Sequence, residues 1–183
     1  MRLETERLVL REWRDSDKPL YAAIVGDPEV RRYFESTATL ADVIVGIDRA
    51  TAQLAEVGFS FLAVEVKADG ALIGMLGMAP IKDTLRALLP DAPGVEIGWL
   101  LAKSHWGQGL APEGARAVLD FAWNEAGLPE VGACTYRGNL PSRRVMEKLG
   151  MRYDAGSDFD HPDIEAGHPV RPHVLYRISN PKL

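Results

Sequence analysis

Two glycines one residue apart, Gly107 and Gly109, directly precede a segment whose apolar residues recur at helical spacing, namely Ala115, Val118, Leu119 and Ala122. Glycine adopts positive φ angles and lets a backbone approach a ligand closely. The first N–H groups of a helix lack partners within the helix and lie at the positive end of its dipole, which favours anions. Pro112 suits the first turn, where no N–H is needed. The pattern predicts a pyrophosphate site, with a plain tight turn as the alternative.

The residues around these glycines exclude two common phosphate-binding loops. No Gly-Lys-Ser/Thr sequence follows the turn, so the loop of nucleoside triphosphatases is excluded. Leu110-Ala111-Pro112 stands where the dinucleotide-binding fingerprint would place its third glycine. The predicted anion site therefore belongs to another class of phosphate-binding turn.

The predicted site needs a strand before it and a further strand and helix beside it. Val95–Leu101 is expected to be that strand, and the helix that follows the glycines should run to about Ala126, with Gly127 ending it. Glu130–Tyr136 is expected to be the next strand. Asn139 is a candidate N-cap for a helix that ends near Gly150.

The rest of the chain alternates between strand and helix patterns. Two helices are predicted, over residues 19–25 and 40–57, and Asp69-Gly70 indicates a hairpin between two strands. The stretches 82–94 and 156–172 are expected to be loops; the second is long and rich in Asp and His, which is typical of a functional loop. The remaining predicted strands are 7–13, 59–66, 72–81, 151–153 and 173–178.

Composition limits the classes of protein to which this chain can belong. Its 183 residues, 46% hydrophobic and 26% charged, suit one globular domain over residues 1–183. A net charge of −5 does not provide the basic surface of a general nucleic-acid binder. No apolar run is long enough to span a membrane, and the first residues contain no apolar signal core. A single cysteine, Cys134, fits a reducing cytoplasm, and the four histidines lack zinc-ligand spacing.

Four runs of residues together resemble one known family, the GNAT acetyltransferases. The runs are Glu96-Ile97-Gly98-Trp99, Trp106-Gly107-Gln108-Gly109-Leu110-Ala111, Asn139-Leu140-Pro141-Ser142-Arg143 and Met146-Glu147-Lys148-Leu149-Gly150-Met151. More narrowly, the chain is similar to the RimJ/RimL-like branch, named for enzymes that acetylate the N-termini of ribosomal proteins. The resemblance extends from Thr5-Glu6-Arg7-Leu8 to Leu175-Tyr176.

The resemblance implies an α+β fold with a mixed, mostly antiparallel sheet of about seven strands flanked by about four helices. The strand Val95–Leu101 would splay from the strand that ends at Tyr136, and acetyl-CoA would bind in the gap. Its pantetheine arm would lie along Trp99, Leu100 and Leu101. The other residues that the resemblance assigns to the cofactor are Trp106, Gly107, Gln108, Gly109, Leu110, Ala111, Asn139, Ser142 and Arg143.

The reaction implied by the resemblance is direct attack of a neutral amine on the thioester, with no protein nucleophile. It needs a base for the amine, N–H donors for the oxyanion and an acid for the leaving thiolate. Ser142 is the candidate acid, Glu96 the candidate base, and Asn139 has a second role beside the pantetheine. Asp160 or His161 would orient or deprotonate the amine. Each residue also has a simpler alternative. Asn139 would be only a helix cap, and Ser142 an ordinary first-turn serine. Glu96 would be a solvated strand residue, and Asp160 and His161 would only keep their loop soluble.

We therefore expect a cytoplasmic N-acetyltransferase that uses acetyl-CoA as co-substrate and needs no metal. The acceptor would be a small amine or a protein N-terminus, and neither nucleic acid nor a membrane is an expected partner. Two alternatives remain: a catalytically silent acyl-CoA-binding or regulatory module, and an unrelated phosphate-binding protein. The sequence specifies neither the acceptor nor the oligomeric state, for which a homodimer is one alternative.

Overall fold

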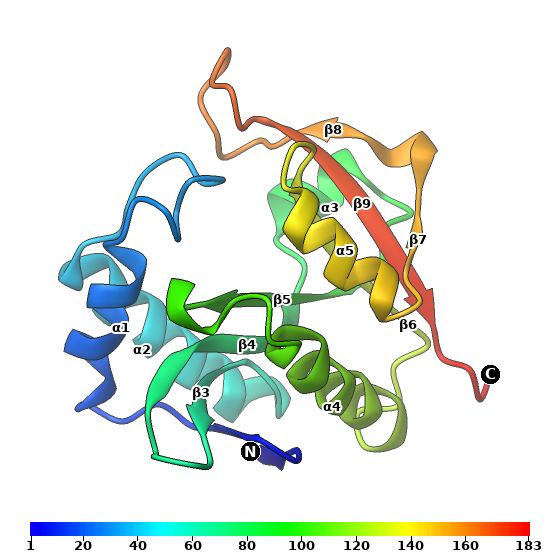
Figure 1. Ribbon diagram of the computed structural model, residues 1–183. Coiled ribbons are helices and arrows are strands. Elements are labelled where there is room, and N and C mark those ends of the chain that lie inside the picture. The colour runs from blue at the N-terminus through cyan, green and yellow to red at the C-terminus, as the bar shows by residue number, and fades with distance from the viewer.

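A computed structural model describes residues 1–183, in which five helices cover a nine-stranded sheet (Figure 1). The helices are α1 Asp17–Val25, α2 Leu40–Val57, α3 Asp83–Leu88, α4 Leu110–Asn124 and α5 Leu140–Lys148. The strands are β1 Arg2–Glu4, β2 Leu8–Arg11, β3 Phe61–Val66, β4 Leu72–Pro80, β5 Val95–Leu101, β6 Glu130–Tyr136, β7 Arg152–Tyr153, β8 Phe159–Asp160 and β9 Pro172–Ser179.

The sheet runs in the order β1-β2-β3-β4-β5-β6-β9-β7, and β8 also pairs with β9. Every neighbouring pair is antiparallel except β5 and β6, which are parallel. The predicted α+β class with a mixed, mostly antiparallel sheet is confirmed. None of the helices combines the length and the apolar composition that a membrane span requires.

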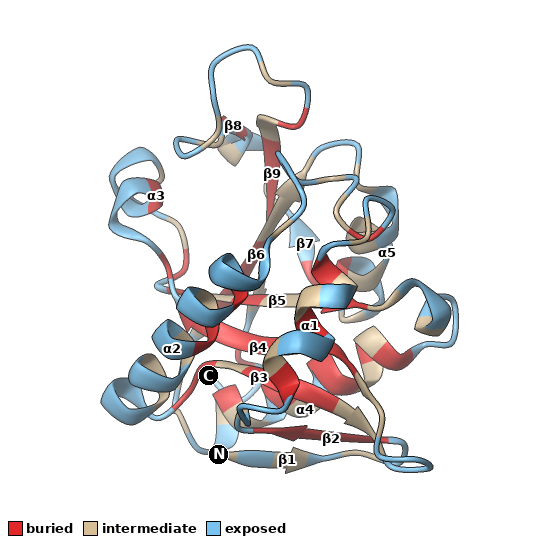
Figure 2. Cartoon of the chain, turned by 90° about the vertical axis from the view of Figure 1, so that its left-hand side faces the viewer, coloured by how far each residue is buried: buried red, intermediate tan, exposed pale blue.

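The two faces of the sheet carry different helices. Ile97 of β5 and Ala133 of β6 join the main core, which packs against α4 and α5 through residues such as Val118 and Met146. On the opposite face, Leu100 of β5 packs with α1 and α2. Cys134 lies on this second face, against the small apolar cluster that contains Leu85 of α3 and Phe159. Figure 2 shows buried residues along the strands and exposed residues on the outer side of α2.

Local sequence signals explain where the helices of the site begin and end. The Thr39 hydroxyl and the Asp42 carboxylate form a reciprocal capping box at the start of α2, which ends at Gly58 with φ 81°. The Asn139 carbonyl oxygen accepts the Ser142 N–H at the start of α5. The predicted bounds of α2 and this cap are therefore confirmed.

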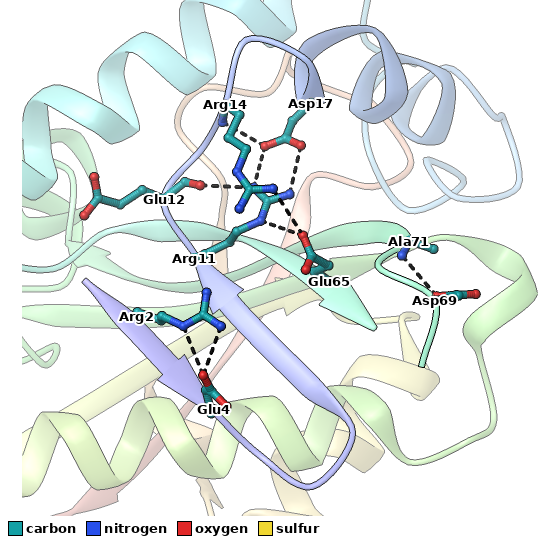
Figure 3. Close-up of polar contacts among 9 residues, drawn as sticks. All are labelled: Arg2, Glu4, Arg11, Glu12, Arg14, Asp17, Glu65, Asp69 and Ala71. Atoms are coloured by element: carbon teal, nitrogen blue, oxygen red, sulfur yellow. Dashed lines mark hydrogen bonds and ion pairs between the residues drawn. The ribbon is translucent and has the colours of Figure 1, made fainter. Parts of the chain in front are cut away.

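A buried ion-pair network fixes α1 to the sheet (Figure 3). The Arg11 guanidinium donates to both Asp17 carboxylate oxygens, at 2.7 and 3.0 Å, and to Glu65 at 2.8 Å. Burial opposes ionisation of Asp17, but hydrogen bonds from Arg11 and from the Arg14 amide outweigh it and lower its pKa. Asp17 is the first residue of α1, so its contacts with Arg11 hold the start of this helix. The network positions the start of α1 against β2 and β3.

The structure contains more elements than the resemblance implies. The stretch 82–94, expected to be a loop, begins with α3, because its two prolines lie beyond this helix and Leu85 has a buried position to occupy. β1 has three residues, and β7 and β8 have two each. Strands of two or three residues are too short to show a periodic pattern in the sequence. They form by pairing with a neighbouring strand, β1 with β2 and both β7 and β8 with β9.

Candidate active site

β5 and β6 diverge beyond one registered pair, and we call the region between their diverging ends the cleft. The two parallel strands share a single registered pair, Glu96 with Gly132, although β5 continues to Leu101 and β6 to Tyr136. Over the same residues β5 stays paired with β4 along its whole length. One edge of β5 beyond Glu96 therefore lacks a neighbouring strand, and the predicted divergence of these strands is confirmed.

Five consecutive amides line the turn at one end of this cleft. The N–H groups of residues 107–111 donate no hydrogen bond within the protein, and the first helical bond of α4 runs from Glu113 N–H to the Gly109 carbonyl at 3.2 Å. Gly107 and Gly109 have φ values of 73° and 77°, in the left-handed region that favours glycine. Unpaired amides at a helix N-terminus fit a phosphate or pyrophosphate. We call residues 107–111 the cradle.

An arginine beside the cradle was not identified from the sequence. The Arg7 guanidinium donates to the Gln108 carbonyl at 3.0 Å and, through Nε, to the Glu113 carboxylate at 2.7 Å. Glu113 also accepts the Arg7 amide at 2.9 Å and the Thr5 hydroxyl at 2.5 Å. These contacts tie the start of β2 to the first turn of α4. Glu113 could have indicated such an arginine from the sequence. An acidic residue in the first turn of a helix that binds an anion needs a cationic partner to neutralise it.

Two of the predicted cofactor residues support the turn with their side chains. The Trp106 indole N–H donates to the Leu101 carbonyl at 2.8 Å, which joins the turn to the end of β5. The Gln108 side-chain amide donates to the Ser104 carbonyl at 3.0 Å. Gln108 therefore offers only its main-chain N–H to a ligand. The half-buried Trp99 packs against the main core on the α4 side of the sheet.

The start of α5 holds three further predicted residues. Asn139 caps the helix, and its side-chain amide also donates to the Thr135 hydroxyl of β6 at 2.9 Å. The Ser142 hydroxyl makes no hydrogen bond within the protein, so it is free to act on a ligand. The Arg143 guanidinium donates to the Tyr176 hydroxyl and to the Arg137 carbonyl, both at 3.1 Å. Arg143 thus has a structural role in holding α5 against β9.

Glu96 lies half-buried at the point of divergence, on the face opposite α4 and α5. The Cys134 thiol donates to its carboxylate at 3.5 Å. Burial raises the pKa of Glu96, and the Cys134 thiol and the Lys82 charge only partly offset this. Burial and the nearby Glu96 carboxylate raise the pKa of the Cys134 thiol. Glu96 therefore has the environment of a proton acceptor, and Cys134 that of a neutral thiol.

The two predicted residues of the long loop have different surroundings. Asp160 is exposed, and its carboxylate lies 3.5 Å from Arg171 Nε. His161 is half-buried and its ring lies 4.9 Å from that of His173 on β9. Burial lowers the pKa of His161, so the imidazole is neutral at pH 7. The structure therefore brings His161, but not Asp160, to the Glu96 face.

His173 and Tyr33 are further candidates that sequence reasoning missed, and both lie beside Tyr136. His173 pairs with Tyr136 across β9 and β6, so both side chains point to the Glu96 face. The Tyr33 ring lies 6.1 Å from the Tyr136 ring. His173 Nδ1 lies 2.9 Å from the Arg171 carbonyl, which assigns the proton to Nδ1 and the lone pair to Nε2. The strand alternation in β6 and β9 contained this signal for His173 and Tyr136.

Comparison with known proteins identifies similar sequences over most of the chain. A family model described as "Acetyltransferase (GNAT) domain" matches residues 7–152. YkkB of Bacillus subtilis, described as an uncharacterized protein, is 31% identical over 153 residues, which are 83% of this chain and 86% of YkkB.

Solved structures share the fold. An acetyltransferase (GNAT family) from Bacillus anthracis superposes with a TM-score of 0.79 at 24% identity and covers 98% of this chain and 99% of its own. Mycobacterium smegmatis RimJ in complex with CoA-disulfide gives a TM-score of 0.76 at 18% identity, over 100% of this chain and 88% of RimJ. At these identities the similarity concerns the arrangement of helices and strands.

Proposed function

This chain belongs to the GNAT family of acetyltransferases, and we propose that it transfers an acetyl group from acetyl-CoA directly to a primary amine. The acceptor would be a small amine or a protein N-terminus. One observation carries the proposal: the divergence of β5 and β6 leads to five unpaired amides at the start of α4. Such a site suits a long ligand that combines an extended polar arm with a pyrophosphate.

The residues fit acetyl-CoA, which would supply an acetyl group activated as a thioester. The cradle amides would hold its pyrophosphate, and the free edge of β5 from Trp99 to Leu101 would face the pantetheine arm. Arg7 would add a positive charge beside the cradle and offset the negative charge of Glu113, which would otherwise repel the pyrophosphate. Asn139 and Ser142 would approach from α5, and Arg143 has Nη2 free of internal hydrogen bonds.

Separate residues would handle the two protons of the reaction. Glu96, with its raised pKa, would accept the proton of the attacking amine, and His161 would help to orient the amine. Ser142 would donate a proton to the departing thiolate. Main-chain N–H groups would stabilise the oxyanion, as acyl transfer requires.

Two finer assignments also belong to the proposal. The motif run from Glu96 to Met151 and the fold shared with RimJ support placement in the RimJ/RimL-like branch. A single cysteine without a disulfide partner supports a cytoplasmic location. Residues 1–183 would act as a single catalytic domain.

The experiment that tests this function measures release of free thiol from acetyl-CoA with a panel of primary amines and N-terminal peptides. Calorimetry with acetyl-CoA, ATP and NAD runs beside it. We expect amine-dependent thiol release and tight binding of acetyl-CoA alone among the three ligands. Tight acetyl-CoA binding without any turnover would indicate a silent acyl-CoA-binding module. Equal binding of all three ligands would indicate a general phosphate site rather than a site for acetyl-CoA.

A further inference from the structure

Glu113 occupies an unfavourable position for a residue of an anion-binding helix. It lies in the first turn of α4, where its negative charge would repel a pyrophosphate on the cradle. Its side chain is only 18% exposed, and four donor atoms contact its carboxylate. A carboxylate so fully paired beside an anion site points to a role within the site.

All four donors come from the turn between β1 and β2. The Thr5 hydroxyl and the Arg7 main-chain N–H donate to one oxygen of Glu113, at 2.5 and 2.9 Å. Arg7 Nε and Nη2 contact the other oxygen, at 2.7 and 2.6 Å. The Thr5 hydroxyl also accepts the Leu8 N–H at 2.9 Å, which closes the turn. Glu113 therefore fixes the position of the Arg7 guanidinium.

The remaining nitrogen of the guanidinium contacts the backbone of the cradle. Arg7 Nη1 donates to the Gln108 carbonyl at 3.0 Å. This carbonyl and the Gly109 N–H belong to one peptide unit, which is planar and trans, so the two groups point in opposite directions. Because Arg7 holds the carbonyl, the Gly109 N–H points away from Arg7, and it is one of the five unpaired amides.

This peptide unit needs a restraint because glycine supplies none. Gly109 has a φ of 77°, but a glycine adopts negative φ angles about as readily. A half-turn of the unit would direct the Gln108 carbonyl oxygen, in place of the N–H, toward the side on which a pyrophosphate would bind. The oxygen would repel the phosphate. Arg7 opposes this rotation, since the rotation would remove its carbonyl acceptor.

We propose that Arg7 is a positioning residue, which orients the Gln108–Gly109 peptide unit toward the pyrophosphate of acetyl-CoA, and that Glu113 holds Arg7 in place. The inference rests on the proposed use of acetyl-CoA and adds how the cradle is preorganised. It assigns Arg7 more than a positive charge. A guanidinium contacts two partners in fixed directions, whereas the ammonium group of lysine acts as a point charge.

Two substitutions separate the positioning role from the effect of charge alone. Arg7→Lys keeps the charge but cannot hold Glu113 and the Gln108 carbonyl together, so the acetyl-CoA dissociation constant should rise by about tenfold. Glu113→Gln removes a negative charge beside the anion, yet it should raise the dissociation constant by about threefold or more, because Arg7 loses its anchor.

An effect of charge alone gives the opposite results in calorimetry. Arg7→Lys would then bind acetyl-CoA as well as the wild type, and Glu113→Gln would bind it more tightly. Either of these two results would overturn the proposal.

A second arginine–glutamate pair in the same hairpin provides matched controls (Figure 3). Arg2 Nη2 lies 3.0 Å from the Glu4 carboxylate, and both side chains are about half exposed. Arg2→Lys and Glu4→Gln make the same chemical changes without contact to the cradle, so acetyl-CoA affinity should stay unchanged. Equal losses of affinity in the two pairs would assign the effect to the hairpin as a whole and contradict the proposal.

Two further measurements distinguish positioning from a purely structural role and from contact with another phosphate. Arg7→Lys should raise KM for acetyl-CoA and leave kcat at saturating acetyl-CoA unchanged. Dephospho-CoA, which lacks the 3′-phosphate but keeps the pyrophosphate, should lose affinity for this variant by the same factor as CoA. A loss with CoA alone would place Arg7 at the 3′-phosphate, and a lower melting temperature with unchanged affinity would make its role structural. Either outcome would overturn the proposal.

A titration with inorganic pyrophosphate separates failure of this inference from failure of the proposed function. If the wild type binds no acetyl-CoA, the proposed function is wrong, but the cradle can still be tested. Pyrophosphate should shift the Gly109 amide resonance of the wild type in NMR spectra, and should shift it much less in Arg7→Lys at the same concentration. Equal shifts in the two proteins, or no shift in the wild type, would exclude Arg7 as a positioning residue.

Discussion

Ser142 and Asn139 stand three residues apart at the start of α5, yet their side chains make different contacts. The Asn139 side chain accepts the Ser142 N–H at 3.2 Å and donates to Thr135 at 2.9 Å. The Ser142 hydroxyl makes no internal hydrogen bond. A cap contributes to stability, whereas a free hydroxyl beside the cleft is available for chemistry.

We therefore predict that Ser142→Ala lowers kcat and kcat/KM together by on the order of 10²-fold and leaves acetyl-CoA affinity and melting temperature unchanged. Asn139→Ala should instead lower the free energy of unfolding by about 1 kcal/mol. Steady-state kinetics, calorimetry and urea unfolding of the two variants test the contrast. Full activity of folded Ser142→Ala would assign the thiolate's proton to another donor, with Tyr136 the next to test.

Glu96 provides a prediction about pH. Its pKa in the folded protein is raised above the ordinary 4.5, mainly by burial. Between these two pKa values the folded state binds more protons than the unfolded state, so stability falls as pH rises through this window. Glu96→Gln should remove that loss and unfold at higher urea than the wild type at pH 8. The advantage should shrink at pH 4, where the wild-type carboxyl is protonated in the folded state.

The same variant tests the role of Glu96 in catalysis. Glu96→Gln should reduce kcat/KM by about 10²-fold or more, because the amine loses its proton acceptor. The acidic limb of the wild-type pH profile should disappear with it. A stabilised variant that keeps full activity and the acidic limb would move the base to another residue of this face.

At the scale of elements, the cradle depends on backbone conformation. Gly109 before α4 and Gly58 after α2 have similar φ values, 77° and 81°, and a Cβ would meet no backbone atom within 4 Å at either position. Asparagine tolerates this left-handed region better than other residues with a side chain. Gly58→Asn is therefore a matched control for the conformational cost of Gly109→Asn.

We predict a similar, small loss of stability for both asparagine variants, whereas only Gly109→Asn should raise the acetyl-CoA dissociation constant by about tenfold or more, or about 1.4 kcal/mol. Calorimetry and thermal unfolding measure the two effects separately. Unchanged affinity in folded Gly109→Asn would remove the cradle from the binding site.

Several elements of the fold were predictable because each has a local signal. The capping box and the terminal glycine define α2, Asp69-Gly70 defines the β3–β4 hairpin, and the Gly107–Gly109 spacing defines the cradle. Arg7 and His173 were not found, because their importance depends on partners about 100 residues away or on another strand. Side-chain partners of this kind are set by tertiary packing, which periodicity does not encode.

At the scale of the whole molecule, ligand binding should raise the free energy of unfolding and therefore the melting temperature. A ligand that binds only the folded state at about 100 times its dissociation constant adds about 2.7 kcal/mol. For a chain of this size we expect a rise in melting temperature of roughly 5–10 °C with acetyl-CoA. Desulfo-CoA should give nearly the same rise, because phosphate rather than sulfur anchors the ligand. ATP and NAD should give little, and a null result with desulfo-CoA would contradict the cradle.

The single registered pair between β5 and β6 also divides the folding of the chain into two topological parts. Strands β3, β4 and β5 follow one another as neighbours, so their contacts close short loops. The β6–β9 ladder joins residues separated by more than 35 positions, and α4 must be in place between the two parts. Local contacts form faster than distant ones because less chain entropy is lost. The cleft is thus the seam between the β3–β4–β5 meander, which can form early from local contacts, and the β6–β9 ladder, which must wait for distant parts of the chain.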